Sequence, residues 1–569
     1  MNYTGARIVI ECLIEQGVDT VFGYPGGAIL NIYDELYKNK NRLRHILTAH
    51  EQGASHAADG YARSSGKVGV VMATSGPGAT NLVTGIATAY MDSVPIVAIT
   101  CNVITPLLGK DSFQEIDITG VTMPITKHNF IVRDVRQLAD TIREAFFIAK
   151  TGRPGPVLID IPKDVTAASC DYEPAQSPFD TRFAKRKASL HRIMTVCDIP
   201  DEKIDKLASL INASERPFIY AGGGVVISDA CEELKALAEK AQIPVSTSLM
   251  GKSAFPNTHA LSTGMIGMHG TKASNTAVDR CDLLLAIGTR FSDRVIGDPK
   301  RFAGRAKIVQ IDIDPAEVNK NIAVVDSLVG SIKDALSRLV PLVEKRKASE
   351  WNAKIDEWKT EVPRSRKRIG KLSPKSIFEY VNGSVPPDTI ITTEVGQHQM
   401  WTALFYRFEK PRTFLTSGGL GTMGFGTGAA IGAQFANPDK TVVHFAGDGS
   451  FRMNCNELAT ISHYGLPIII VVFNNGALGN VRQWQTLFYE KRYSATTLDF
   501  APDFVKLADA YDISGVRVTS EAEFKKAFDA ALASGKPAVI DAAIDKDEMV
   551  LPMIPPGKSV DRIMMDIDL

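Results

Sequence analysis

The chain has 569 residues, which is too long for one hydrophobic core and predicts three or four domains of about 150 residues each. Apolar residues make up 44% of the sequence and charged residues 22%, a composition that excludes a disordered or fibrous protein. The 64 Lys and Arg residues balance the 64 Asp and Glu residues, so no net charge draws the protein to nucleic acid or to an anionic membrane.

The first part of the chain alternates short apolar strands with helices. We predict a helix over residues 6–16 and then strands over 20–22, 45–47, 68–72 and 95–100, with helices around 54–63 and 81–90 between them. Such alternation is typical of a mostly parallel sheet with helices on both faces. We therefore expect residues 1–165 to form an N-terminal α/β domain.

Residues 195–340 predict a second α/β domain. It begins with a helix near residue 199, followed by a strand over 217–220, a glycine-rich turn over 221–224, and strands over 281–287 and 307–313. The polar stretch over 345–372 predicts a helical linker to the next domain.

The third predicted domain, residues 373–569, includes a C-terminal tail. Its expected strands are 389–393, 441–446, 466–473, 516–518 and 538–541. A helix over 521–533 has a capping-box spacing in Ser520 and Glu523 and ends at Gly535. The predicted fold class is α/β, with three doubly wound parallel-sheet domains.

The expected location is the cytoplasm. The seven cysteines are scattered without a metal-ligand or redox spacing, which favours a reducing compartment. Apolar runs such as 467–473 are too short to cross a bilayer, and the N-terminus has neither a secretory apolar core nor a transit segment. We expect neither a membrane nor a nucleic acid as partner.

Two neighbouring strand ends in the third domain carry oxygen ligands. Gly447-Asp448-Gly449-Ser450 follows one apolar strand, and Asn474-Asn475 follows the next, one strand–helix–strand step later. Ligands bind beyond the carboxyl ends of parallel strands, where glycines let backbone N–H groups approach phosphate. A bare Gly-Asp-Gly would be an ordinary turn, but polar residues after a buried strand need partners. The pair therefore predicts a Mg²⁺ site.

A carboxyl group stands at a comparable place in the first domain. Residues 48–54 end an apolar strand and begin an Ala/Gly-rich helix, so we expect Glu51 to be buried. A carboxyl group isolated in apolar surroundings stays protonated and can donate a proton. The adjacent His50 is either catalytic or a hydrogen-bonded packing residue.

The Gly-Asp-Gly and Asn-Asn pair resembles the signature of thiamine-diphosphate-dependent enzymes. The resemblance implies that Asp448, Asn475 and the carbonyl of Ala477 bind the metal, and that Met423 wedges the cofactor into a bent form. It also implies that Glu51 donates to the pyrimidine of the cofactor, whose own amine then removes the thiazolium proton.

Nearly the whole chain resembles the biosynthetic catalytic (large) subunit of the acetohydroxyacid synthase family, also called acetolactate synthase. The resemblance rests on the stretches 22–28, 74–81, 113–115, 152–156, 267–270, 290–295 and 483–485. It implies decarboxylation of pyruvate and transfer of the hydroxyethyl carbanion to a second 2-ketoacid, pyruvate or 2-ketobutyrate, as the first common step of branched-chain amino acid biosynthesis.

The resemblance also assigns roles to individual residues. The implied catalytic residues are Glu51, Gly27, Gln114 and Lys163, and the implied substrate contacts are Phe113, Arg294 and Trp484. The implied thiamine diphosphate contacts are Tyr24, Pro25, Gly26, Glu51, Val395, Gly396, Gln397, His398, Gly421, Met423, Gly447, Asp448, Gly449, Ser450, Asn475, Ala477, Leu478, Gly479, Asn480 and Val481. The implied FAD contacts are Arg153, Gly222, Gly223, Gly224, Met268, Arg290 and Asp312.

Simpler interpretations exist for several of these residues. Trp484 alone indicates core or interface packing, and Arg294 alone a surface or ion-pair arginine. Gln114 and Lys163 alone would be surface polar residues. The sequence also departs from the family pattern, because Asn480 stands where Met is usual and Ser331 where Asp is usual near the flavin adenine. These departures bear on acceptor choice and on FAD affinity.

The implied assembly is a homodimer or homotetramer, in which the first domain of one subunit faces the third domain of its neighbour. A small regulatory subunit is a further implied partner. Two rival functions remain: a flavin-dependent pyruvate oxidase or other 2-ketoacid decarboxylase of the same fold, and a noncatalytic nucleotide-binding or regulatory protein.

Overall fold

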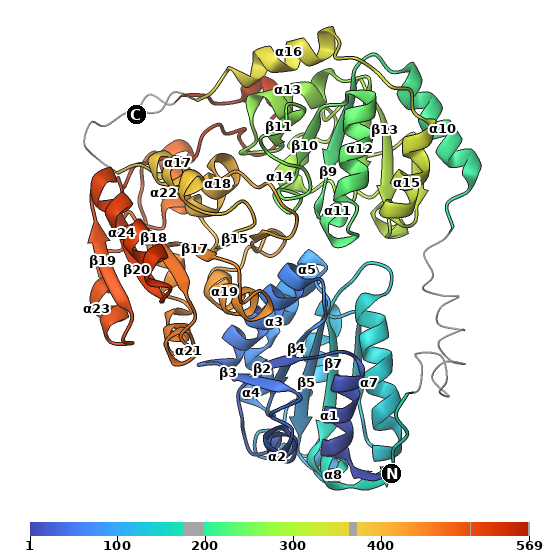
Figure 1. The fold of residues 1–569 in the computed structure, drawn as a ribbon, viewed down its shortest axis with the longest axis vertical. Helices are drawn as coiled ribbons and strands as arrows, with labels where there is room; N and C mark the ends of the chain where they lie inside the picture. The colour runs from blue at the N-terminus through green and yellow to red at the C-terminus, as the bar shows by residue number, and fades with distance from the viewer. Residues whose placement is uncertain (176–197, 364–371, 501, 567–569) are drawn as a thin grey trace.

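The computed structural model describes residues 1–175, 198–363, 372–500 and 502–566. Within these residues the chain forms three six-stranded sheets whose strands all run parallel, each flanked by helices, and one small antiparallel pair of β1 (Asn2–Thr4) with β8 (Ser169–Asp171). Figure 1 shows the sheets as separate blue, green and orange bodies. The predicted fold class is confirmed.

The first sheet has the strand order β3-β2-β4-β5-β7-β6. Its strands are β2 (Thr20–Gly23), β3 (Arg44–Leu47), β4 (Gly69–Ala73), β5 (Ile96–Asn102), β6 (His128–Ile131) and β7 (Val157–Pro162). Its main helices are α1 (Gly5–Glu15), α2 (Leu30–Lys38), α3 (Glu51–Ser65), α4 (Pro77–Asn81), α5 (Val83–Asp92), α6 (Ile118–Thr122), α7 (Val135–Lys150) and α8 (Lys163–Ala167). The helix expected around 81–90 is α5, and the short helix α4, which has Pro77 as its first residue, precedes it.

The second sheet has the order β11-β10-β9-β12-β13-β14. Its strands are β9 (Pro217–Ala221), β10 (Val245–Thr247), β11 (Ser262–Met265), β12 (Leu283–Ile287), β13 (Lys307–Asp312) and β14 (Asp326–Val329). Its helices are α10 (Asp201–Ala213), α11 (Gly223–Ile227), α12 (Cys231–Ala241), α13 (Lys272–Arg280), α14 (Asp293–Ile296) and α15 (Ile332–Leu342). The predicted linker contains α16 (Glu350–Lys359), and its residues 364–371 lie outside the described residues.

The third sheet has the order β16-β15-β17-β18-β20-β19. Its strands are β15 (Ile390–Thr393), β16 (Phe414–Leu415), β17 (Val442–Gly447), β18 (Ile468–Asn474), β19 (Ser514–Val518) and β20 (Ala538–Ala543). Its helices are α17 (Pro374–Ser384), α18 (Gln397–Phe405), α19 (Phe425–Ala436), α20 (Asp448–Phe451), α21 (Leu458–His463), α22 (Gly479–Phe488), α23 (Phe504–Asp509) and α24 (Glu521–Ser534). The capping box of α24 and its left-handed end at Gly535 are both confirmed.

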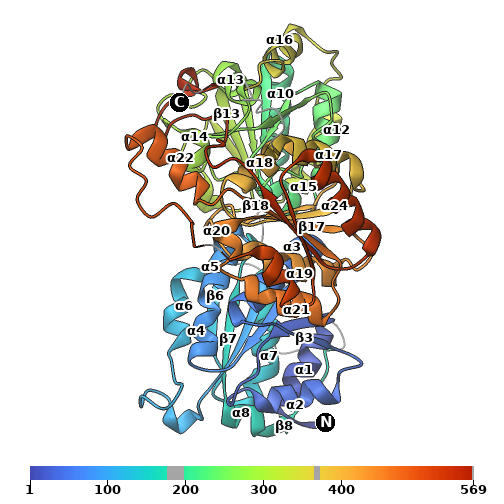
Figure 2. The same ribbon diagram turned by 90° about the vertical axis from the view of Figure 1, so that its left-hand side faces the viewer.

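Helices α3 and α19 join the first domain to the third, and both views place them side by side at the boundary (Figures 1 and 2). Glycines allow the close approach. A Cβ atom on Gly432 would lie 1.8 Å from the carbonyl oxygen of Ala57, and one on Gly60 would lie 2.2 Å from that of Ala429. One hydrophobic core therefore runs through both domains, from Ala57 to residues of α19 and α21.

The C-terminal tail returns to the second domain, where Ile554 N donates to Met268 O at 2.7 Å. Figure 1 shows this red segment beside α13 and β11. Among the described residues, we find no helix with the length and apolarity that a membrane crossing requires.

Candidate active site

The predicted metal ligands lie at one edge of the third sheet. Strands β17 and β18 are parallel neighbours with Gly447 opposite Phe473, so the residues that follow each strand meet. The backbone N–H groups of Gly449, Gly476 and Ala477 surround the Asp448 carboxylate. In the second turn, Ala477 N donates a hydrogen bond to Asn475 Oδ1 at 3.1 Å. The structure thus brings together the Gly-Asp-Gly turn and the Asn-Asn turn, as the sequence predicted.

The Asp448 side chain fits a cation. It is 2% exposed, and its Oδ2 atom has no hydrogen-bond partner among the described residues. Burial raises the pKa of Asp448 to about 7, although the N–H groups around it oppose that shift. No group of three or more His, Cys, Asp or Glu side chains in the described ranges could hold a metal by itself. The buried, unpartnered Oδ2 of Asp448 is an oxygen ligand of the kind that Mg²⁺ takes, and this metal completes its shell with phosphate oxygens and water.

The start of α18 forms a cradle beside Asp448. A Cβ on Gly447 would lie 2.8 Å from His398 Nδ1, and one on Gly479 would lie 2.0 Å from Gln397 Oε1. The His398 Nε2 atom is buried without a partner in the described part of the chain, so an anion at this helix N-terminus could accept its hydrogen bond. The predicted contacts gathered here are Val395, Gly396, Gln397, His398, Gly421, Gly447, Asp448, Gly449, Ser450, Asn475, Ala477, Leu478 and Gly479.

A buried carboxylate that the sequence analysis missed supports the loop carrying Met423. Glu394 is fully buried and accepts hydrogen bonds from the N–H groups of Gly424 at 2.5 Å, Gly426 at 3.0 Å and Thr427 at 3.2 Å. It thereby caps the N-terminus of α19. Glu394 directly follows the buried strand β15, and a charged residue at the end of a predicted strand is the signal that also identified Asp448.

The first domain presents Glu51 at the first residue of α3. Glu51 is buried, as predicted, and its Oε2 atom accepts a hydrogen bond from Asn81 Nδ2 at 2.9 Å. His50 precedes it as the N-cap residue, and His50 Nδ1 accepts from Gln52 N at 3.0 Å. Of the two roles left open for His50, the structure favours the hydrogen-bonded one.

Other predicted residues of this domain lie at the same sheet edge, at the ends of β2, β4 and β7. Gly26 packs on Thr74, and the backbone of Gln114 packs on Gly76. Tyr24, Pro25 and Gly27 belong to the same loop as Gly26, and Lys163 follows β7. Phe113 is 87% exposed in this single chain.

A cavity of about 540 Å³ lies where the three domains meet. Its walls bring together residues predicted for three ligands. They are Arg153, Gly222, Gly223, Gly224, Met268, Arg290 and Asp312 for FAD, Arg294 and Trp484 for the substrate, and Gly421 and Asn480 for thiamine diphosphate, together with Ser331. Glu51, Asp448 and Asn475 are not among its lining residues.

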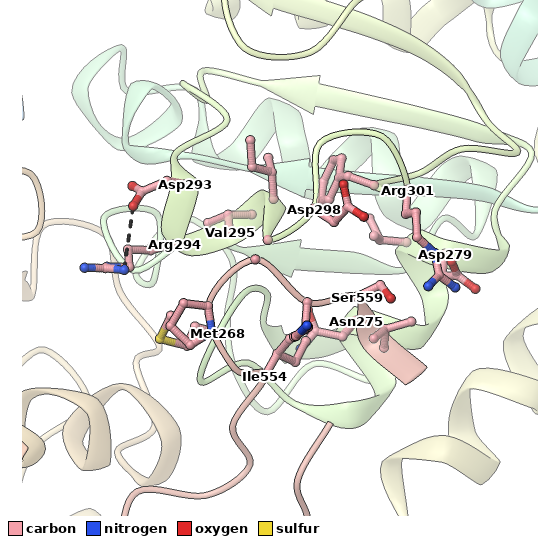
Figure 3. Close-up of a pocket in the computed structure, with 18 of the residues that line it drawn as sticks. Met268, Asn275, Asp279, Asp293, Arg294, Val295, Asp298, Arg301, Ile554 and Ser559 are labelled. Atoms are coloured by element: carbon pink, nitrogen blue, oxygen red, sulfur yellow. Dashed lines mark ion pairs between the residues drawn. The ribbon is translucent and has the colours of Figure 1, made fainter. Parts of the chain in front are cut away.

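The tail forms a smaller neighbouring pocket of about 140 Å³, which shares Met268, Arg294 and Val295 with the larger cavity. In Figure 3 the tail residues Ile554 and Ser559 lie beside Met268 and Asn275, and a dashed line joins Arg294 to Asp293.

The residues predicted to bind FAD form ion pairs and packing contacts with other protein groups. Arg153 pairs with Glu317 at 2.7 Å and Asp314 at 3.2 Å, and burial raises the pKa of Asp312 to about 6. Gly222 and Gly224 pack on Gly288, so they have a structural role besides any ligand contact. Ser331 caps α15 by accepting a hydrogen bond from Asp334 N at 3.2 Å.

Comparison with known families gives matches along the chain. The family model described as thiamine pyrophosphate enzyme, N-terminal TPP binding domain, matches residues 3–121. The central domain of the same enzymes matches residues 204–339, and their C-terminal TPP binding domain matches residues 394–542. These three matches correspond to the three sheets.

Full-length relatives are also similar to the chain. It is 50% identical to a probable acetolactate synthase large subunit of Methanocaldococcus jannaschii, over 99% of this chain and 95% of the relative. It is 47% identical to an acetolactate synthase large subunit of Parasynechococcus marenigrum, over 98% and 90% of the two chains. It is 46% identical to that of Corynebacterium glutamicum, over 100% and 91%.

Proposed function

Because this chain belongs to the thiamine pyrophosphate enzymes, and among them to the acetolactate synthase large subunits, we propose that it decarboxylates pyruvate and joins the remaining two-carbon unit to a second 2-ketoacid. The acceptor is pyruvate or 2-ketobutyrate, as in branched-chain amino acid biosynthesis. The observation that carries this proposal is identity near 50% over almost the entire chain. Neither an oxidase nor a noncatalytic protein is favoured by these relatives.

The cofactors are thiamine diphosphate with Mg²⁺, and FAD. When bound, thiamine diphosphate supplies an acidic thiazolium C–H group and an electron sink. Asp448, Asn475 and the carbonyl of Ala477 would hold the metal, and the start of α18 would hold the diphosphate. The unpartnered Oδ2 of Asp448 and Nε2 of His398 support this assignment.

Glu51 would form a hydrogen bond with the pyrimidine ring. Its carboxyl group is buried and is oriented by Asn81, which fixes the direction in which it can donate. Gln114, Lys163 and Gly27 lie at the same sheet edge and would border the substrate there.

The second subunit completes the active site. Neither Glu51 nor Asp448 lines the large cavity, and Phe113 and Met123 expose 87% and 69% of their surface to solvent. Both observations support a homodimer or homotetramer in which Glu51 of one copy meets the metal end of another. The relatives are named large subunits, which supports a small regulatory partner. We place the enzyme in the cytoplasm.

The large cavity holds the acceptor and the flavin. Arg294 grips the acceptor carboxylate, and Trp484 borders its side chain. Gly222–Gly224, Met268, Asp312 and Arg153 of this cavity would hold the flavin, which would have a structural role.

Product analysis tests the reaction. Purified protein supplied with pyruvate, thiamine diphosphate, Mg²⁺ and FAD is expected to form acetolactate. Formation of peroxide with acetyl phosphate, or of acetaldehyde alone, would overturn the proposal.

A further inference from the structure

A carboxylate of the third domain holds the peptide groups that precede Glu51. Glu457, at the end of the short helix Cys455–Glu457, accepts hydrogen bonds from His50 N at 3.0 Å through Oε1 and from Ala49 N at 3.2 Å through Oε2. Thr460 Oγ1 donates to the same Oε2 atom at 2.6 Å. The side chain is 0% exposed, so water does not compete for these contacts.

The neighbouring residues leave Glu457 little room to move. A Cβ on Gly53 would lie 2.0 Å from Oε1, so the carboxylate sits directly against the first turn of α3. Thr48 Oγ1 donates to His50 O at 3.1 Å and fixes the same turn from the other side. The segment from Thr48 to His50 is therefore fixed by hydrogen bonds from both domains.

This contact controls the place of Glu51, because Glu51 is the residue directly after His50 and the first residue of α3. Its carboxyl group is held separately, by Asn81. Two contacts therefore set its position. Asn81 of the first domain holds the side chain, and Glu457 of the third domain holds the backbone just before it. A shift of about 1 Å at a reacting group can lower the rate about 10²-fold, so losing a contact that fixes this backbone is expected to slow the reaction.

All three groups around Glu457 are donors, and the N-terminus of a helix favours an anion. A glutamine at this place could accept with only one atom. Its amide nitrogen would face an N–H group of Ala49 or His50, so one buried donor would lose its partner.

We infer that Glu457 is a positioning residue for Glu51: the third domain sets the place of the activating carboxyl of its own chain through the peptide groups of Ala49 and His50. This inference rests on the proposed function, in which Glu51 activates the cofactor. Glu457 itself touches neither substrate nor cofactor in this role.

The first test uses the protein without cofactors. In Glu457→Gln, the backbone N–H groups of Ala49 and His50 are expected to exchange with deuterium at least about tenfold faster, as measured by mass spectrometry on the peptide that spans them. Glu51→Gln is expected to leave this exchange unchanged. Equal protection in Glu457→Gln and the parent would overturn the inference.

The second test follows the cofactor itself in the loaded enzyme. Exchange of the thiazolium C–H proton for deuterium, measured by NMR after acid quenching, is expected to slow about tenfold or more in Glu457→Gln. The kcat is expected to fall more than KM for pyruvate changes. Glu457→Gln added to Glu51→Gln is expected to slow the exchange no further, because the two residues act on one step.

Tyr464→Phe is the matched control. Tyr464 Oη accepts a hydrogen bond from Leu47 N at 2.9 Å, which also joins the third domain to the backbone before α3. This variant is expected to keep the parent thiazolium exchange rate. If it slowed exchange as much as Glu457→Gln does, the effect would be a general loosening of the domain contact and the inference would fail.

The outcomes separate the two claims. If Glu51→Gln leaves thiazolium exchange unchanged, the proposed role of Glu51 fails. If Glu51→Gln slows it while Glu457→Gln does not, only the inference fails. Should Glu457→Gln not fold, Glu457→Asp carries the same tests, because its shorter carboxylate keeps the charge but cannot reach both N–H groups.

Discussion

The guanidinium group of Arg294 lies over the indole ring of Trp484, 5.9 Å from the ring centroid, although one residue belongs to the second domain and the other to the third. A charged group and a large apolar surface thus border the same part of the cavity. This pairing suits a 2-ketoacid, whose carboxylate and alkyl group need different environments.

Trp484→Leu is therefore expected to reduce the preference for 2-ketobutyrate over pyruvate as acceptor. The loss of ring contact with the extra methylene of the substrate is expected to change the product ratio about tenfold, in the range that one methylene gives in an apolar pocket. A competition assay with both acceptors measures the ratio. An unchanged ratio would remove Trp484 from acceptor selection.

Asn480 carries an unsatisfied atom in the cavity wall. Its Oδ1 is buried and has no partner among the described residues. Asn480→Met removes this buried polar atom and is expected to stabilise the unliganded protein by about 1 kcal/mol, raising its Tm. The more apolar wall is also expected to increase use of 2-ketobutyrate in the same competition assay. A lower Tm would show that the amide is satisfied in solution.

Asp448→Asn tests the metal end of the site. Mg²⁺ prefers a charged oxygen ligand, and the neutral amide is expected to weaken cofactor binding at least about 100-fold. At a cofactor concentration about 100 times the parent Kd, the parent gains about 2.7 kcal/mol from binding and the variant loses most of this gain. The measurement is the rise in Tm on adding thiamine diphosphate with Mg²⁺. The rise on adding FAD alone serves as the control and is expected to persist.

The burial of His56 is expected to lower the free energy of unfolding in acid. Burial, with repulsion from Arg63 as a smaller cause, lowers the pKa of His56 from 6.5 to about 3. Between these values the unfolded chain binds a proton that the folded chain does not, so stability falls as pH falls, by about 1.4 kcal/mol per pH unit from this group. His56→Phe keeps a ring on Phe425 and removes the titration.

The measurement for His56→Phe is the change in Tm between about pH 7 and about pH 5. This change is expected to be smaller in the variant than in the parent. Replacing the exposed His128 in the same way is the control, and it is expected to reproduce the parent. An identical acid response in all three proteins would contradict the prediction.

Gly432→Ala is expected to destabilise the contact between α3 and α19. The added methyl group would lie 1.8 Å from Ala57 O, so one helix must move and the protein is expected to lose about 3 kcal/mol or more. Gly383→Ala is the matched control, because nothing lies within 4 Å of its added atom in α17. It is expected to leave Tm unchanged or slightly raised, since alanine favours helix. Comparable losses in both variants would argue against backbone contact as the cause.

Much of the fold could be predicted because buried parallel strands are apolar runs with polar or glycine-rich ends. Strands without that pattern were missed. β6 is a partly exposed edge strand, β16 has two residues, and β7 contains Asp160 and Pro162, which resemble strand breakers. Asp160 is tolerated because Thr100 and Asn102 donate hydrogen bonds to it.

The local parts of the site could be predicted for the same reason. Asp448 and Asn475 follow neighbouring strands, so chain order alone brings them together. The contact between Glu457 and the backbone of Ala49 and His50 leaves no such trace, because it joins residues about four hundred positions apart through the packing of two domains.

The close approach of α3 and α19 limits which mutations this contact can tolerate during evolution. Gly60 and Gly432 meet carbonyl oxygens of the opposite helix, with no volume left for a Cβ atom. Every amino acid that a one-base change can produce from a glycine codon carries a Cβ atom. A single-base substitution that replaces either glycine can therefore only disrupt the contact between the two cofactor-binding domains. Gradual changes in how these domains pack must begin at other positions of the two helices.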